Sequence, residues 1–125
     1  MRAAVYKKYG PPDVVSIAEV QKPVPGARDL LVKVVASSIT SGDARLRAFN
    51  LPKPFASPGR LALGIFGPRK QVLGVEFAGT VEAVGSGVTT FRPGDRVFGI
   101  DVFGCHAEYK LVRENECVAL MPEGL

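Results

Sequence analysis

Polar side chains gather directly after the longest apolar run of this sequence, and they are the first candidates for chemistry. The run Leu30–Ser38 is followed by Thr40, Ser41 and Asp43. Hydroxyl groups can donate hydrogen bonds to a ligand, and a carboxylate can accept them. The same three residues suit the start of a short helix, because Thr40 or Ser41 can cap it and an acidic residue in the first turn complements the helix dipole. A ligand contact and a helix cap both remain open at this stage.

The other titratable candidates are few. Cys105 and Cys117 are the only cysteines, and His106 is the only histidine. A catalytic zinc needs three ligands such as Cys, His or carboxylate, while strand alternation would point Cys105 and His106 to opposite faces. We therefore expect no metal site and no histidine base. Asp43 and Glu76 could form a carboxylate pair, but we expect each to pair with a neighbouring arginine and to fix loop geometry.

Short strands separated by Gly- and Pro-rich turns must position these groups. The near-continuous apolar run of Leu30–Ser38 predicts a strand that is buried on both faces, with Lys33 reaching solvent. Alternation predicts a first hairpin from Arg2–Lys8 and Val14–Val20. Two further strands are predicted near the end of the chain, at Gly104–Val112 and Cys117–Met121.

The segment Leu73–Gly99 organises the rest of the predicted fold. Its alternating apolar residues predict a strand around Val81 that is bent at Gly85-Ser86-Gly87, where we expect glycine to allow positive φ. Arg92-Pro93-Gly94-Asp95 matches the type II turn preference, with Pro second and Gly third. Arg96 then begins another strand. Strands bent by glycine and joined in this way predict a small curved sheet or barrel.

The stretch from Phe49 to Val72 is the least regular part of the sequence. It holds Phe55 and Phe66 among other apolar residues, yet four prolines lead us to expect no long helix. An apolar loop of this length either folds onto its own core or forms a wall or lid of a binding pocket. The sequence leaves both alternatives open.

Composition narrows the class of protein. The 125 residues fit one ordered domain, since 46% are hydrophobic and 22% are charged. Six basic and no acidic residues lie between Arg45 and Lys70, but without the regularly placed aromatics of a nucleic-acid platform. We expect no nucleic-acid partner, no membrane segment, and a reducing, cytoplasmic location because cysteines are so few. No G-x-G-x-x-G loop opens a helix, so we expect no tight dinucleotide site on this chain.

The central segment also carries a resemblance to a known family. Its glycines and the turn after them follow the spacing Gly74-x-Glu76-x-x-Gly79-x5-Gly85-x-x-Val88 and then Pro93-Gly94-Asp95-Arg96-Val97. This pattern is similar to that of the N-terminal half of medium-chain dehydrogenases/reductases. The resemblance covers essentially all of residues 1–125. It implies a GroES-like domain: mainly β, with short helices, built as a partly open β-barrel on the substrate side of the active site.

Two substitutions set this sequence apart from zinc-containing members of that family. Val75 stands where they have a metal-binding His, and Thr40 stands where they have a metal-binding Cys. The quinone-reductase-like members resemble this chain more, because they lack zinc and carry an Asp at the position of Asp43. Their usual Asn is replaced here by Thr40. The resemblance therefore implies a zinc-independent enzyme that passes hydride from NAD(P)H to a carbonyl or an activated alkene.

The same resemblance implies roles for individual residues. Thr40 and Ser41 would face nicotinamide or substrate, Asp43 would orient their loop, and Phe49 and Phe66 would form apolar pocket wall. NAD(P)H would be held by a C-terminal Rossmann domain that residues 1–125 do not contain, so we expect this chain to be inactive alone. The alternative is a stand-alone GroES-like binding module, or a co-chaperonin-like ring subunit, without catalysis.

Overall fold

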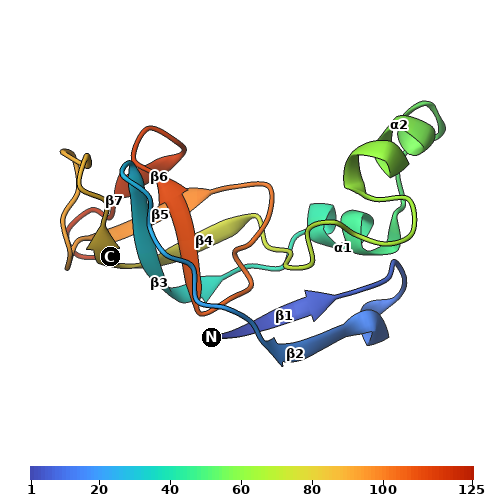
Figure 1. Ribbon diagram of the computed structural model, residues 1–125, viewed down its shortest axis with the longest axis horizontal. Coiled ribbons are helices and arrows are strands. Elements are labelled where there is room, and N and C mark those ends of the chain that lie inside the picture. Colours follow the sequence, from blue (N-terminus) through green and yellow to red (C-terminus); the bar gives the residue numbers. More distant parts are fainter.

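The computed structural model describes all 125 residues as a mainly β domain with two sheets and two helices. The smaller sheet pairs β1 (Arg2–Tyr6) with β2 (Val15–Glu19). The larger sheet has the order β6-β3-β4-β5-β7, and all its pairs are antiparallel. Its strands are β3 (Asp29–Ser37), β4 (Glu76–Val84), β5 (Arg96–Ile100), β6 (Tyr109–Arg113) and β7 (Val118–Leu120). The sheet curls into an open half-barrel (Figure 1), and the expected GroES-like architecture is confirmed.

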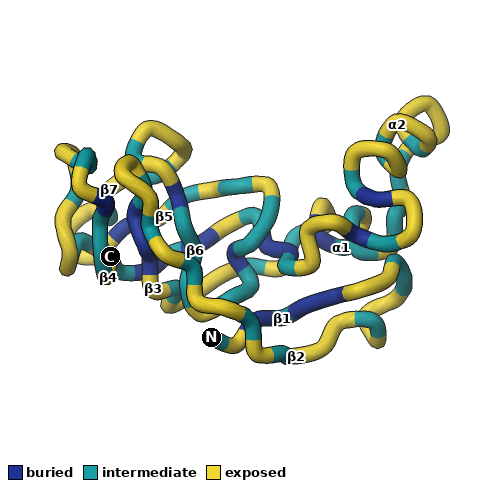
Figure 2. The backbone as a smooth tube through the Cα atoms, in the orientation of Figure 1, coloured by how far each residue is buried: buried dark blue, intermediate teal, exposed yellow.

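Strand β3 shows where the hydrophobic core lies. Leu30 and Val32 have no exposed surface and pack with Phe77, Val81 and other residues of the neighbouring strands. The prediction that this strand is buried on both faces holds only for its first half. Beyond a bulge between Val34 and Ala36 its side chains are largely exposed (Figure 2). The end of β3 therefore leaves the core just before the polar loop.

The backbone conformation predicted for the glycines of the central segment is found at Gly94 but not at Gly85. Gly94 has φ +94°, as the third position of a type II turn requires, and the turn joins β4 to β5. Gly85 does not have positive φ. Its hydrogen faces the Gly26 carbonyl oxygen, which a Cβ would approach to 1.9 Å. Close backbone contact, and not backbone conformation, thus requires glycine at this bend.

The predicted first hairpin is confirmed. Its strand β1 is hydrogen-bonded to the rest of the molecule. Backbone bonds run from Ala4 N to His106 O and from Tyr6 N to Gln71 O, both 2.9 Å. Strand β6 begins at Tyr109, later than the predicted Gly104, because the chain bends at His106, whose carbonyl oxygen accepts from Ala4 N.

The region after Phe49 contradicts the expectation that its prolines prevent a long helix. Following α1 (Ser41–Ala48), helix α2 (Lys53–Leu63) runs for eleven residues with Pro58 inside it. Pro54 lies in the first turn, where a missing N–H costs little. Helix α2 stands away from both sheets and buries no residue (Figures 1 and 2). Neither helix is long and apolar enough to cross a membrane.

Candidate functional site

The polar loop after β3 is fixed by a buried carboxylate. Asp43 is 2% exposed, and its Oδ2 accepts hydrogen bonds from the backbone N and the hydroxyl of Thr40 at 2.9 and 3.0 Å. The Thr40 hydroxyl in turn accepts from Asp43 N at 3.2 Å, which completes a reciprocal cap on α1. Asp43 Oδ1 accepts from Gly74 N at 3.1 Å. One carboxylate therefore joins the start of α1 to the segment that leads into β4.

This geometry shows the helix-cap role of Thr40. Since the Thr40 proton points to Asp43, Thr40 serves as the helix cap and has no second proton to offer a ligand. Ser41 is exposed at the first position of α1, and its hydroxyl is not held by a side-chain hydrogen bond. Of the two hydroxyls singled out from the sequence, Ser41 is the one free to donate.

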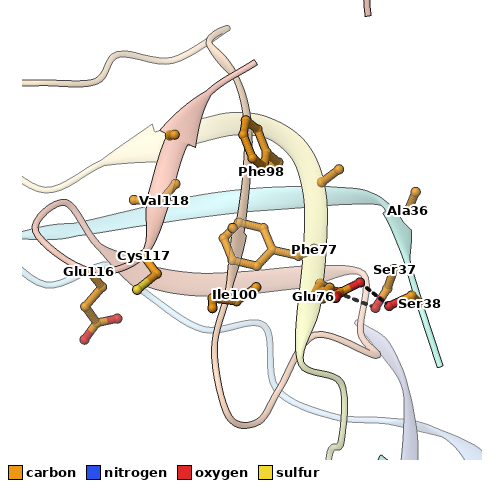
Figure 3. A pocket seen from close by; sticks show the side chains of 13 residues that line it. Ala36, Ser37, Ser38, Glu76, Phe77, Phe98, Ile100, Glu116, Cys117 and Val118 are labelled. Atoms are coloured by element: carbon orange, nitrogen blue, oxygen red, sulfur yellow. Dashed lines mark hydrogen bonds between the residues drawn. The ribbon is translucent and has the colours of Figure 1, made fainter. Parts of the chain in front are cut away.

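A second set of polar contacts lies on the same loop. His106 Nε2 is 2.9 Å from the carbonyl oxygen of Ser38 and 3.9 Å from Asp43 Oδ2. The Ser38 hydroxyl donates to Glu76, and the Ser37 hydroxyl donates to the Glu76 carbonyl oxygen (Figure 3). The sequence analysis did not single out Ser38. Its position as the last, polar residue of the run Leu30–Ser38 was the available signal.

The expectation that Asp43 and Glu76 each pair with an arginine is therefore wrong. Both carboxylates are satisfied by hydroxyl and amide donors of nearby loops. Thr40, at the cap of α1, donates to Asp43, and Ser38, just after β3, donates to Glu76. These local donors take the place of the expected arginine ion pairs. Their proposed effect, which is to fix loop geometry, is the part that the structure supports.

An apolar cavity of about 790 Å³ opens beside Glu76, on the face of the sheet formed by β3, β4, β5 and β7. Its labelled walls in Figure 3 include Phe77, Phe98 and Ile100, with Ser38 and Glu76 at one rim. Here it is called the sheet cavity. A volume of this order suits a small organic ligand.

A second cavity of about 580 Å³ lies on the other side of the polar loop, between α1, the start of β4 and the end of β5. It is called the helix cavity. Its apolar lining includes Leu46, Leu51, Val75 and Val102. Both cavities share Ile100, Glu116 and Cys117 as wall residues. Since Ser38 borders the sheet cavity and Gly42 borders the helix cavity, the loop that carries Thr40 and Ser41 runs between them.

The two aromatic residues expected to form pocket wall lie elsewhere. The Phe49 ring packs 5.0 Å from the Tyr9 ring, and Phe66 is fully exposed beyond α2. Neither lines the sheet cavity or the helix cavity. Leu51, which the sequence analysis passed over as a loop residue, is the member of this region that reaches a cavity.

The electrostatics of the site reflect burial and ion pairing. Burial raises the pKa of the Cys105 thiol to about 11, so this side chain behaves as a core residue. Asp101, on the wall of the helix cavity, lies 2.5 Å from Lys110 Nζ. Desolvation opposes this carboxylate's charge, yet the hydrogen bond from Lys110 prevails and its pKa is lowered. No three His, Cys, Asp or Glu side chains converge on a point where they could share a metal ion.

Two groups bound by members of the resembling family, a zinc ion and a dinucleotide pyrophosphate, do not fit the residues at the corresponding positions of this chain. At the zinc positions, the hydroxyl of Thr40 is held by Asp43 and Val75 has no donor atom. The glycines at Gly85 and Gly87 approach the carbonyl oxygens of Gly26 and Ala27, so backbone fills the space that a phosphate cradle would need. At these positions the residues present fit neither a zinc ion nor a pyrophosphate.

Comparison with known proteins agrees with this architecture. Residues 26–123 match the family described as the alcohol dehydrogenase GroES-like domain. Quinone oxidoreductase from Pseudomonas aeruginosa is 33% identical over 121 residues, which cover 96% of this chain and 33% of that protein. A mycocerosic acid synthase-like polyketide synthase from Mycolicibacterium smegmatis is 32% identical over 121 residues, which cover 97% of this chain and 5% of that protein.

A solved structure shows the same fold over the whole chain. Escherichia coli quinone oxidoreductase complexed with NADPH superposes with a TM-score of 0.80 at 25% identity. The match covers 100% of this chain and 34% of the Escherichia coli protein. The 125 residues thus span about a third of the length of the quinone oxidoreductases that they match.

Proposed function

The chain belongs to the alcohol dehydrogenase GroES-like family, in the quinone-reductase-like branch of the medium-chain dehydrogenases/reductases, and from this we propose that it forms the substrate side of a zinc-independent NAD(P)H-dependent oxidoreductase. The substrate would be a small molecule with a carbonyl or an activated alkene. The dinucleotide would be held by a C-terminal Rossmann domain, in a cytoplasmic enzyme that needs neither nucleic acid nor membrane. The relatives named quinone oxidoreductase support this proposal.

One observation carries the proposal: a polar loop runs between two apolar cavities that share a wall. An acceptor substrate for hydride needs an apolar site for its body and a hydrogen-bond donor for the oxygen on which charge develops. The loop offers the free hydroxyl of Ser41 for the second task. Asp43 acts as a positioning residue, because it holds the loop through Thr40 and Gly74.

The absence of fitting zinc ligands supports the zinc-independent form of this proposal. Valine and a capped threonine stand at the two positions where zinc-containing members of the family have ligands. Stabilisation of the substrate oxygen would then depend on hydrogen-bond donors alone. A preorganised donor of this kind typically changes turnover by about 10²-fold.

The test is a comparison of two hydroxyl variants in the protein that carries this chain together with its nucleotide-binding domain. NADPH oxidation is followed with a panel of quinones and enals. We expect Ser41→Ala to lower kcat by about 10²-fold. Thr40→Val is expected to act through the helix cap and to lower thermal stability. Turnover that is unaffected by Ser41→Ala would remove the Ser41 hydroxyl from the mechanism.

The 125-residue chain alone provides the second arm of the test. It is expected to show no NADPH-dependent turnover, because hydride transfer needs the donor held in near-attack geometry and we propose that the donor is held by the Rossmann domain. Measured turnover by the chain alone would contradict the proposal. A heptamer on a sizing column would instead favour the stand-alone, co-chaperonin-like alternative.

A further inference from the structure

We propose that Leu51 and Gly59 determine the size of the ligand that the helix cavity admits. The inference rests on the proposed function only in taking this cavity as part of the substrate site. It concerns the size of the apolar part of the substrate, and in particular whether the cavity admits a fused pair of aromatic rings or only a single ring.

Leu51 contributes to the cavity wall from outside the strands and outside α1. The opposite wall is held by backbone pairing, since Asp101 N donates to Val75 O at 2.8 Å and Ile100 is the last residue of β5. The α1 wall is fixed through the Asp43 cap. Leu51 lies on the linker between the two helices and lines the same cavity. A change in the position of the Leu51 side chain therefore changes the size of the cavity.

Gly59 on α2 lies directly against the Leu51 side chain. A Cβ at Gly59 would meet Leu51 Cδ1 at 2.5 Å and Phe49 Cζ at 3.6 Å. The first distance is too short for two carbon atoms, so a side chain at position 59 must displace the Leu51 methyl group. Because Leu51 also lines the cavity, displacement of this methyl group away from position 59 would reduce the cavity volume.

Helix α2 can act as this support because it is tied to the body of the domain at the next residue. The Arg60 guanidinium lies over the Phe49 ring at 4.3 Å and over the Tyr9 ring at 4.8 Å. The Tyr9 hydroxyl donates to Gly64 O at 3.0 Å. These contacts hold the helix at the turn that contains Gly59, so the support cannot move away freely when Leu51 is pushed.

Two substitutions should change the cavity in opposite directions. Leu51→Ala enlarges it, and Gly59→Ala reduces it. Gly59→Ala is also favourable for the helix itself, because alanine is the better helix former. The atom that must yield is the end of a flexible side chain, so the variant is expected to fold. Ser57→Ala, an exposed position two residues earlier on α2, is the matched control for helix propensity without a cavity effect.

The measurement is the affinity of two unreactive probes, phenol and 2-naphthol, from ¹³C-methyl NMR titrations of this chain. The reported quantity is the Kd for 2-naphthol divided by the Kd for phenol. We expect Leu51→Ala to lower this ratio by about tenfold, since a change of one or two methyl groups in an apolar pocket has an effect of this order. Gly59→Ala should raise the ratio, and Ser57→Ala should leave it as in the parent chain.

A ratio that stays unchanged in both variants, or that moves in the same direction in both, would overturn the inference. A change in Leu51→Ala alone would support the role of Leu51 and refute that of Gly59. The binding measurement needs no cofactor. If size discrimination is found but the enzyme does not oxidise NADPH, the proposed function fails and the assignment of the cavity wall stands.

Discussion

The curled sheet and the α2 arm are held in place by different physical means. The sheet has a contiguous core of fully buried aliphatic side chains, among them Leu30, Val32 and Val97. Helix α2 buries no residue, and it is attached through one guanidinium, two aromatic rings and a tyrosine hydrogen bond. The sheet therefore gives the domain its stability, whereas α2 contributes position and little stability.

The polar loop lies between these two regions and shares features of both. It follows a core strand, but its own geometry depends on Asp43 and not on apolar burial. If the candidate site is built on this loop, its precision comes from one buried carboxylate. Substitutions in the three regions should then differ in size and in kind.

The largest expected effect is in the core of the sheet. Leu30→Ala removes a side chain with no exposed surface, and we expect a loss of about 3 kcal/mol in the free energy of unfolding. Leu61→Ala on α2 changes a leucine that is 62% exposed and should cost less than about 0.5 kcal/mol. Urea denaturation of both variants measures the difference. Equal losses would show that α2 is packed more closely in solution than the contrast between the regions implies.

Asp43→Ala is expected to have the next largest effect. It leaves the donors Thr40 N and Gly74 N without their acceptor in a buried site, which should cost about 2 kcal/mol. Thr40→Ala removes only the hydroxyl of the cap and should cost about 1 kcal/mol. Asp13→Ala, an exposed carboxylate, controls for loss of charge. If Asp43→Ala proved no more destabilising than Asp13→Ala, the loop would not depend on the carboxylate.

The same contrast explains how much of the fold could be predicted from the sequence. The strand around Val81, the turn at Gly94 and the first hairpin follow from alternation and turn chemistry, which are local signals. Helix α2 was missed because proline counts were weighed without their positions: Pro54 falls in a first turn, and the helix tolerates Pro58 despite the missing donor. The need for Gly85 was predicted correctly but for the wrong reason, since its neighbour is more than fifty residues away in the sequence.

The candidate site shows the same limit. Thr40, Ser41 and Asp43 were found because helix caps and polar loops have sequence signatures. Nothing local shows that the Thr40 proton is directed to Asp43, or that His106 lies 2.9 Å from the Ser38 carbonyl oxygen. Phe49 and Phe66 were chosen as pocket wall by residue type, whereas Leu51 lines the helix cavity because of where α2 stands. Tertiary placement decides which apolar residue becomes a wall.

A third prediction concerns pH and the end of the sheet away from α2. Glu114 accepts hydrogen bonds from Thr89 N, from Arg28, and from the hydroxyl and backbone of Thr90, and these lower its pKa to about 2 against the opposing effect of desolvation. Because the folded pKa lies below the ordinary value of 4.5, the stabilisation is complete above pH 4.5 and is lost as the pH falls toward 2.

The variant Glu114→Gln should therefore be less stable than the parent chain at pH 7, and the difference should narrow at pH 3. Urea midpoints at the two pH values measure it. Glu123→Gln, an exposed carboxylate near the end of the chain, should show no such narrowing. A Glu114→Gln difference that is the same at both pH values would mean that the carboxylate is not held by these donors in solution.

The smallest expected effect is local and lies in the α2 arm. Arg60→Leu removes the cation from between the Tyr9 and Phe49 rings, a loss of about 1 kcal/mol that should appear as local opening and leave the unfolding of the sheet unchanged. Hydrogen exchange at Gly64 N, which donates to Arg60 O at 2.9 Å, should accelerate about fivefold, while exchange at Val32 in β3 stays as in the parent chain.

Arg60→Lys keeps the charge but loses the planar stacking surface, so its Gly64 exchange rate should fall between those of Arg60→Leu and the parent chain. Lys53→Met removes a cation from the start of α2 without touching the rings and should leave Gly64 exchange unaltered. Should Arg60→Leu instead accelerate exchange at Val32 to the same degree, α2 and the sheet would open together, and the separation of the two regions would be wrong.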